Sequence, residues 1–514
     1  MAFIAGVSFV LAICISLHLF ATKAKFSIAR WKAKWHHGCQ DPPSYPHKDL
    51  HGKDLGDLST EAYKERRFLD FNTELFQTYG PTFRTITGGK VWIKTKDPRL
   101  SKAIYSTFFN NFGLAPIRYE VDGFFGDGIL VTDGDHWKQS RALIRPAFEI
   151  AHIANFERLH RHVKRFMELI PDDGSTIDLL PIFKRLTLDL STEFIFGKSM
   201  NALSTPNASS KFLKAFSTAQ SGVVMNPATR DKDWKASCEL VHNYVDARVE
   251  EAISRVYSCD KGLKEESRYL RLSDELAKTT KDRKVLRYQV LSVFSPAHDS
   301  VAVTLGNLFF HLARNQSAWE ELRKEILPTK SQELTYKLLT SYKYLNWALR
   351  ETHRLTPIAQ ASQRECIQTC ILPIGGGIDG QRPLLVEKGT VIETNFRAMQ
   401  RDEEVFGKDA ENFRPDRWRF IRPSWEFTPF SGGPRICPAL RLVYIESQYI
   451  AASLIRRFSA VELRDPELRW VEDRRLIYQS RNGTLGSTSI NTTFSILNKL
   501  NGDKQLSRQL HSSH

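Results

Sequence analysis

The sequence predicts a mainly α-helical fold with a minor β-sheet region, as a single large domain behind an N-terminal transmembrane helix. Helix-type apolar periodicity runs through long segments of the 514-residue chain, whereas strand-like alternation is confined to short runs. The predicted helices include residues 136–149, 151–170, 184–196, 236–256, 285–314, 316–326, 342–355 and 439–457. The predicted strands are residues 82–86, 91–93, 384–386 and 391–394.

The N-terminal transmembrane helix is predicted from a run without charge. Residues 2–21 carry no charged side chain and are about long enough to span a bilayer as a helix. Lysines and arginines follow, with Trp31 and Trp35 among them, as in segments at a cytosolic membrane surface. A cleaved signal peptide, the alternative, places its positive charge before a shorter apolar core. We therefore expect a single-pass anchor with the body of the protein in the cytosol.

The sequence divides into four segments. We assign residues 1–22 to the anchor, 23–46 to a basic and Pro-rich linker, 47–500 to the folded domain and 501–514 to a polar tail. The prolines at the end of the linker fix φ and predict a stiff, extended connector. No second linker, internal repeat or low-complexity segment follows.

Charge and cysteine content exclude several classes of protein. The net charge of +15 suits a nucleic acid, an anionic membrane or an acidic protein partner. Without a nucleic-acid module or a long basic run, we favour the last two. Seven scattered cysteines do not form the pattern of a secreted disulfide framework. Cys366 and Cys370 could be a metal-binding pair, but no second pair with zinc spacing accompanies them.

The strongest local signal is the loop of residues 430–440. Two glycines and a proline predict a tight, non-helical turn before Cys437, and Pro438 suits the first position of the helix that follows. A helix N-terminus stabilises a thiolate and lowers the pKa of its thiol, and a thiolate binds metals. Arg435 can donate to a carboxylate. A buried structural cysteine is the alternative for an isolated Cys.

Three further patterns lie on predicted helices. Glu351 and Arg354 are three residues apart and can pair, although such pairs are usually exposed and weak. Trp137 and Arg141 are one turn apart; alone they could be a core Trp beside a solvated Arg. The segment 296–300 combines a helix-breaking proline with an acid and an alcohol, and the proline should kink its helix.

Together these motifs resemble the cytochromes P-450, over roughly residues 45–490 and in the order of that family. The loop matches the family's haem-binding signature at Phe430, Gly433, Arg435 and Cys437, and departs from it at Ala439, where the family usually has Gly. The resemblance implies that Cys437 ligates the iron of haem b. It also places Phe430 and Arg435 beside the haem.

The resemblance assigns roles to the other motifs. Trp137, Arg141 and Arg364 would bind the haem propionates. Glu351 and Arg354 would form a buried network with Arg417, which serves the scaffold and haem incorporation rather than the chemistry. Asp299 and Ser300 match the oxygen-activation groove and would relay protons. This groove departs from the family pattern, because the chain has Ala297 in place of Gly and Ser300 in place of Thr.

The implied activity is that of a haem-dependent monooxygenase of the endoplasmic reticulum membrane, acting on a small apolar substrate. Electrons would come from NADPH through NADPH–cytochrome P-450 reductase, whose acidic flavin domain would suit a basic surface. Residues 375–380 fit G-x-G-x-x-G, but a strand-like run follows them instead of a helix, so they predict a hairpin loop. We expect a monomer with no nucleic-acid partner.

The substrate is less well defined. Residues 124–129 and 372–380 resemble the fungal alkane and fatty-acid hydroxylase branch, and the Phe-rich region 108–130 is expected to form part of the pocket wall. The substrate is either a fatty acid or alkane-like chain, or an intermediate of fungal secondary metabolism. A haem-thiolate isomerase or dehydratase, and a non-catalytic haem-binding protein, are the alternative functions.

Overall fold

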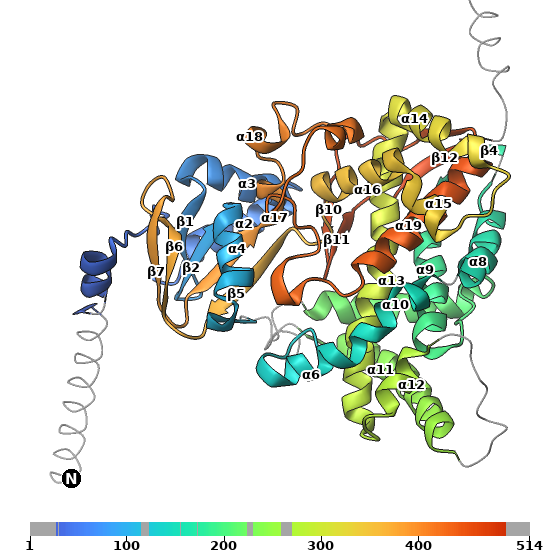
Figure 1. The fold of residues 1–514 in the computed structure, drawn as a ribbon, viewed down its shortest axis with the longest axis horizontal. Helices are drawn as coiled ribbons and strands as arrows, with labels where there is room; N and C mark the ends of the chain where they lie inside the picture. Colours follow the sequence, from blue (N-terminus) through green and yellow to red (C-terminus); the bar gives the residue numbers. More distant parts are fainter. Residues whose placement is uncertain are drawn as a thin grey trace, which may run out of the picture. The chain divides into compact units, whose positions relative to one another are not determined.

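The described residues of the computed structural model form two compact units (Figure 1). The structure describes residues 27–28, 30–114, 123–154, 156–171, 173–223, 230–258 and 270–489. Unit 1 contains the described residues before 115 together with 361–399 and 424–436, and unit 2 contains the rest. The chain passes between the units several times, in keeping with the absence of a second linker in the sequence.

The N-terminal segment differs in part from its prediction. The expected anchor, residues 1–22, and the polar tail, residues 501–514, lie outside the described residues. Within the described part, no helix is long and apolar enough to cross a bilayer. The basic part of the linker, for which no structure was predicted, is helical over residues 30–37. Its Pro-rich end is extended and joins the sheet of unit 1, where Tyr45 N donates to Arg84 O at 2.9 Å.

Unit 1 is built on a five-stranded mixed sheet with the strand order β1-β2-β8-β5-β3. Strand β2 pairs antiparallel with β1 and parallel with β8, and β5 is antiparallel to β8. A separate hairpin joins β6 to β7. The strands are β1 (Thr82–Thr87), β2 (Lys90–Thr95), β3 (Phe112–Gly113), β5 (Ala361–Cys366), β6 (Cys370–Gly376), β7 (Arg382–Val386) and β8 (Val391–Asn395). The helices are α2 (Lys53–Lys64), α3 (Phe68–Tyr79), α4 (Pro98–Lys102) and α17 (Phe396–Met399).

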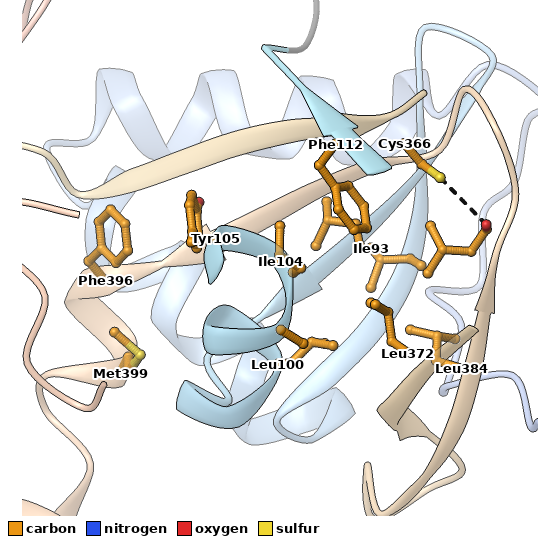
Figure 2. Packing of buried hydrophobic residues seen from close by; sticks show 13 residues of the cluster. Ile93, Leu100, Ile104, Tyr105, Phe112, Cys366, Leu372, Leu384, Phe396 and Met399 are labelled. Carbon is orange, nitrogen blue, oxygen red and sulfur yellow. Dashed lines mark hydrogen bonds between the residues drawn. The ribbon is translucent and has the colours of Figure 1, made fainter. Parts of the chain in front are cut away.

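An apolar cluster joins the hairpin, the sheet and α4 of unit 1. Leu100 of α4 and Leu372 of β6 are fully buried in it, and Phe112 of β3 is almost so. Figure 2 shows these side chains together, with Cys366 of β5 at the edge of the group. Burial of this apolar area holds the hairpin against the sheet.

Unit 2 contains most of the helices. They are α6 (Gly134–Ile144), α7 (Ile150–Ile153), α8 (Phe156–Glu168), α9 (Leu179–Phe196), α10 (Pro206–Val223), α11 (Lys232–Tyr257), α12 (Leu272–Ala277), α13 (Arg283–Arg314), α14 (Gln316–Ile326), α15 (Tyr336–Ser341), α16 (Lys343–Leu355), α18 (Glu403–Phe406) and α19 (Leu440–Arg457). Its short strands are β4 (Asp173–Asp178), β9 (Ala460–Leu463), β10 (Glu472–Arg474), β11 (Tyr478–Ser480) and β12 (Leu485–Ser489). The prediction of a mainly helical fold with minor sheets is confirmed.

Helix α13 is the central element of unit 2. It packs along α9 and also contacts α11, α16 and α19 (Figure 1). Asp282 caps its N-terminus by accepting from the backbone N–H of Lys284 at 2.9 Å. The helix is buried around most of its circumference, as expected for a helix that is apolar on all sides. It stays helical across Pro296, and the predicted kink at this proline stays a prediction.

Candidate functional site

The Cys437 loop connects a short 3-10 turn to helix α19. The turn covers Gly433–Arg435, and α19 begins at Leu440 with Ala439 as its N-cap residue. Pro438 therefore precedes the cap, and the prediction that it occupies the first helical position is wrong. Gly433 has a φ of 65°, and a Cβ there would lie 1.9 Å from the carbonyl oxygen of Tyr105. Only glycine fits this left-handed, crowded position.

The surroundings of the Cys437 sulfur act on its charge in opposite directions. Burial raises the pKa of the thiol, whereas the backbone N–H groups of Ala439 and Leu440 and the guanidinium of Arg141 lower it. Burial has the larger effect, so the pKa is raised overall and the predicted lowering is wrong in sign. The N–H groups act as predicted, but the sequence does not show how deeply the sulfur lies. A bound metal cation stabilises the thiolate directly.

Helix α6 carries Trp137 and Arg141 one turn apart, as predicted. Trp137 is buried and Arg141 is half-buried. Burial lowers the pKa of Arg141, and the nearby Cys437 acts against this shift. The guanidinium of Arg141 is therefore within electrostatic range of the candidate ligand, in the same unit of the structure.

The middle of α13 presents two different faces. Between Gln289 and Ala313 every residue is buried except Pro296, Ala297 and Ser300, which share one side of the helix. These three residues are partly exposed, whereas the other residues of this stretch are buried. Asp299 is buried and the next residue, Ser300, is half-buried, so the two predicted relay residues differ in their exposure.

Asp299 is held in a polar cavity of about 470 Å³ that is lined by α9, α10, α13 and the β10–β11 hairpin. Its carboxylate forms an ion pair with Lys184 of α9 at 3.1 Å. Burial acts to raise the pKa of Asp299, but Lys184 and other nearby cations outweigh burial and hold the pKa below its usual value. Lys184 also donates to Gln479 at 2.7 Å. Sequence reasoning missed Lys184, because nothing local links it to a residue so far along the chain.

Arg364, Phe430 and Arg435 belong to unit 1. Arg364 lies on β5 with its guanidinium 4.7 Å from the ring centroid of Tyr105, and it donates to Ser362 Oγ at 3.2 Å. Phe430 and Arg435 are half-buried in the turn before Cys437. The predicted haem-binding residues thus fall on both units, with Trp137, Arg141 and Cys437 in unit 2.

The predicted network around Glu351 is confirmed. Glu351 is fully buried on α16 and accepts two hydrogen bonds from Arg354, both at 2.9 Å. Arg417 donates to the same carboxylate at 2.8 Å. Trp418 Nε1 donates at 3.0 Å and Arg414 N at 3.0 Å. Trp418 follows Arg417 directly in the sequence and was not part of the predicted network.

Comparisons with known proteins decide the family. The sequence profile described as cytochrome P-450 matches residues 59–481, most of the chain. The chain is a cytochrome P-450.

Fungal relatives agree with this assignment. A cytochrome P-450 monooxygenase, iccC, from Talaromyces variabilis is 36% identical over 445 residues, covering 84% of this chain and 88% of that protein. The cytochrome P-450 monooxygenase apdE from Emericella nidulans is 32% identical over 480 residues, covering 90% of this chain and 92% of that protein. A third, tenA from Beauveria bassiana, is 33% identical, covering 84% of this chain and 88% of that protein.

As a cytochrome P-450 monooxygenase, the protein takes haem b bound through a cysteine thiolate, and the residues present fit that group. Cys437 is half-buried, and its thiol interacts with two backbone N–H groups, which suit an anionic ligand. Arg141 supplies a nearby cation suited to a carboxylate. Within the described residues, Ala297 and Ser300 of α13 stay partly exposed.

The Glu351 network is predicted to be a large contributor to stability. Glu351→Gln leaves two buried arginines without their carboxylate, which should lower the free energy of unfolding by about 3–5 kcal/mol. Denaturant titration of the purified cytochrome P-450 measures this change. Glu321→Gln is the matched control, because Glu321 also pairs with a cation three residues away but is exposed. Its expected effect is below about 1 kcal/mol. Equal losses in the two variants would contradict the buried network.

Proposed function

We propose that this monooxygenase inserts one atom of molecular oxygen into an apolar organic substrate, and that Cys437 would hold the haem iron. The observation that carries the proposal is the half-buried Cys437, whose thiol interacts with the N–H groups of Ala439 and Leu440 and with the guanidinium of Arg141. Haem b with a thiolate ligand supplies the activation of oxygen. The chain would bind and orient the haem and the substrate, and it would deliver protons to the oxygen.

The cationic side chains of the predicted set have one shared task. Arg141 and Arg435, on opposite sides of Cys437 in the sequence, would neutralise the propionates together with Arg364. Trp137 would donate its indole N–H to the same groups. Phe430 would pack against the porphyrin. These roles follow from residue chemistry and from the resemblance of the motifs.

The proposed proton relay uses two neighbouring residues of α13, Asp299 and Ser300. Asp299 Oδ1 faces Lys184 in a polar cavity, where water can exchange protons with the carboxylate. Ser300 is partly exposed, as are Ala297 and Pro296. We infer that Asp299 accepts protons from the cavity and that Ser300 Oγ passes them on through water.

The electrons require a partner. Residues 375–380 lie at the turn of the β6–β7 hairpin, so the G-x-G-x-x-G match opens no helix, as predicted. We propose NADPH–cytochrome P-450 reductase as the donor, docking on a basic surface of this protein, whose net charge is +15. We further propose a monomer at the endoplasmic reticulum membrane, held by residues 1–22.

For the substrate we propose an apolar intermediate of fungal secondary metabolism. The fatty-acid alternative rested partly on a Phe-rich pocket wall. Phe124 and Phe125 are instead fully buried, and Phe124 packs against Phe216 of α10 and His242 of α11. These two rings belong to the core, so they favour no long-chain ligand. Pro296 and Ala297, which are unusual for the family, are partly exposed on α13.

The sulfur ligand can be tested spectroscopically. Cys437→Ala should remove thiolate ligation, because no other side chain replaces the sulfur at the N-terminus of α19. The ferrous carbon monoxide adduct of this variant should lack the red-shifted Soret band of a haem-thiolate. Cys238→Ser is the control, since Cys238 is buried on α11, and it should keep the band. An unchanged band in Cys437→Ala would refute the assignment.

The relay predicts a defect in coupling rather than in haem binding. Ser300→Ala removes the hydroxyl that passes protons, so oxygen and NADPH should be consumed with less product and more peroxide. The ratio of product to NADPH, measured with the reductase and a turned-over substrate, reports this defect. Ser300→Thr keeps the hydroxyl and should retain the wild-type ratio. Tight coupling in Ser300→Ala would remove Ser300 from the relay.

A further inference from the structure

Two cysteines meet at the junction of β5 and β6 in unit 1. Cys366 ends β5 and Cys370 begins β6. Cys366 Sγ lies 3.5 Å from the carbonyl oxygen of Val386 (Figure 2), and Cys370 is the direct partner of Val386 in the β6–β7 register. Cys366 Sγ also donates to the carbonyl oxygen of Gln368 at 3.2 Å. Both cysteines therefore adjoin the same residue of β7.

The two sulfurs differ in access and acidity. Cys366 is fully buried in the apolar cluster, whereas Cys370 is half-buried at its border. The neighbouring Cys366 lowers the pKa of Cys370, and the same interaction together with burial raises the pKa of Cys366. A half-exposed thiol of lowered pKa beside a buried thiol is the arrangement of reactive dithiols.

Neither of the simpler explanations accounts for this arrangement. Cysteines that serve only as small apolar side chains gain nothing from mutual contact or from partial exposure. A metal site needs further ligands, and the described residues contain no group of three His, Cys, Asp or Glu side chains placed to hold an ion.

We propose that Cys366 and Cys370 form a reversible disulfide when a hydroperoxide oxidises the folded protein. The Cys370 thiolate attacks the peroxide, the O–O bond breaks, and Cys370 becomes a sulfenic acid as hydroxide or an alcohol leaves. The Cys366 thiol then attacks that sulfur, the S–O bond breaks, and water leaves as the S–S bond forms. The sulfurs lose two electrons and the peroxide gains them. A small thiol such as glutathione reverses the reaction by exchange.

This dithiol would be reduced in a reducing compartment and oxidised only transiently. Intracellular disulfides are generally of this redox-responsive kind. Closure of the S–S bond would link the end of β5 to the start of β6, where only residues 367–369 separate the strands. The proposal stands apart from the assignment of Cys437, because both cysteines lie in unit 1 and outside the haem-binding loop.

The test uses the full-length holoenzyme treated with stoichiometric hydrogen peroxide, then alkylated, digested with trypsin and weighed. Trypsin releases residues 365–388 as one peptide, because the Arg382–Pro383 bond resists cleavage, and this peptide contains Cys366 and Cys370 but no other cysteine. It should appear without alkyl groups and lighter than the dithiol peptide by two hydrogen atoms. Glutathione should restore two alkylation sites. Two alkylated cysteines after peroxide would overturn the proposal, and so would sulfinic acid without a disulfide.

Single variants separate the two roles. In the Cys366→Ser variant, peroxide should leave a sulfenic acid on Cys370, and dimedone should trap it. In the Cys370→Ser variant, the buried Cys366 should stay unmodified. Dimedone labelling of Cys366 in the second variant would contradict the assignment of Cys370 as the attacking thiol. Cys238 is the internal control, because burial raises its pKa to about 12, and it should remain reduced. The ferrous carbon monoxide band of the same samples shows that the haem site is intact, independently of the disulfide.

Discussion

The proposed chemistry of this cytochrome P-450 depends on the balance of charge at one sulfur atom, that of Cys437. Burial opposes the thiolate more strongly than Arg141 and the two N–H groups favour it, so the pKa of the thiol is raised. A bound iron would add the missing stabilisation of the anion, and the two N–H groups would then interact with the anionic ligand.

A second, fully buried set of charges surrounds Glu351 in unit 2. Glu351 accepts from Arg354, Arg417 and Trp418, and Arg354 also donates to the carbonyl oxygen of Gln400 at 3.0 Å. These bonds tie α16 to the segment that follows Gln400. A buried network of this kind stabilises the fold only when every member is paired. Its completeness explains why it can lie in the interior, away from the solvent that would otherwise solvate its charges.

Periodicity predicted most of the long helices, because the pattern lies within each segment. The buried Glu351 network with Arg417 was predicted from the resemblance to the cytochromes P-450, since spacing alone suggests only an exposed pair. Helices α13 and α19 begin within two residues of their predicted starts. The features that could not be predicted from the sequence depend on packing between distant segments. The sign of the pKa shift at Cys437, the ion pair of Asp299 with Lys184, and the burial of Phe124 are of this kind. Strands β4, β5 and β9–β12 are short, and pairing partners rather than local pattern define them.

Iron K-edge X-ray absorption of the purified ferric protein tests the central claim most directly, because it reports the atoms bonded to the metal. The account predicts one sulfur scatterer in the first coordination shell of the iron, in addition to the porphyrin nitrogens. A first shell fitted by nitrogen and oxygen alone, in protein carrying a full complement of haem, would contradict it.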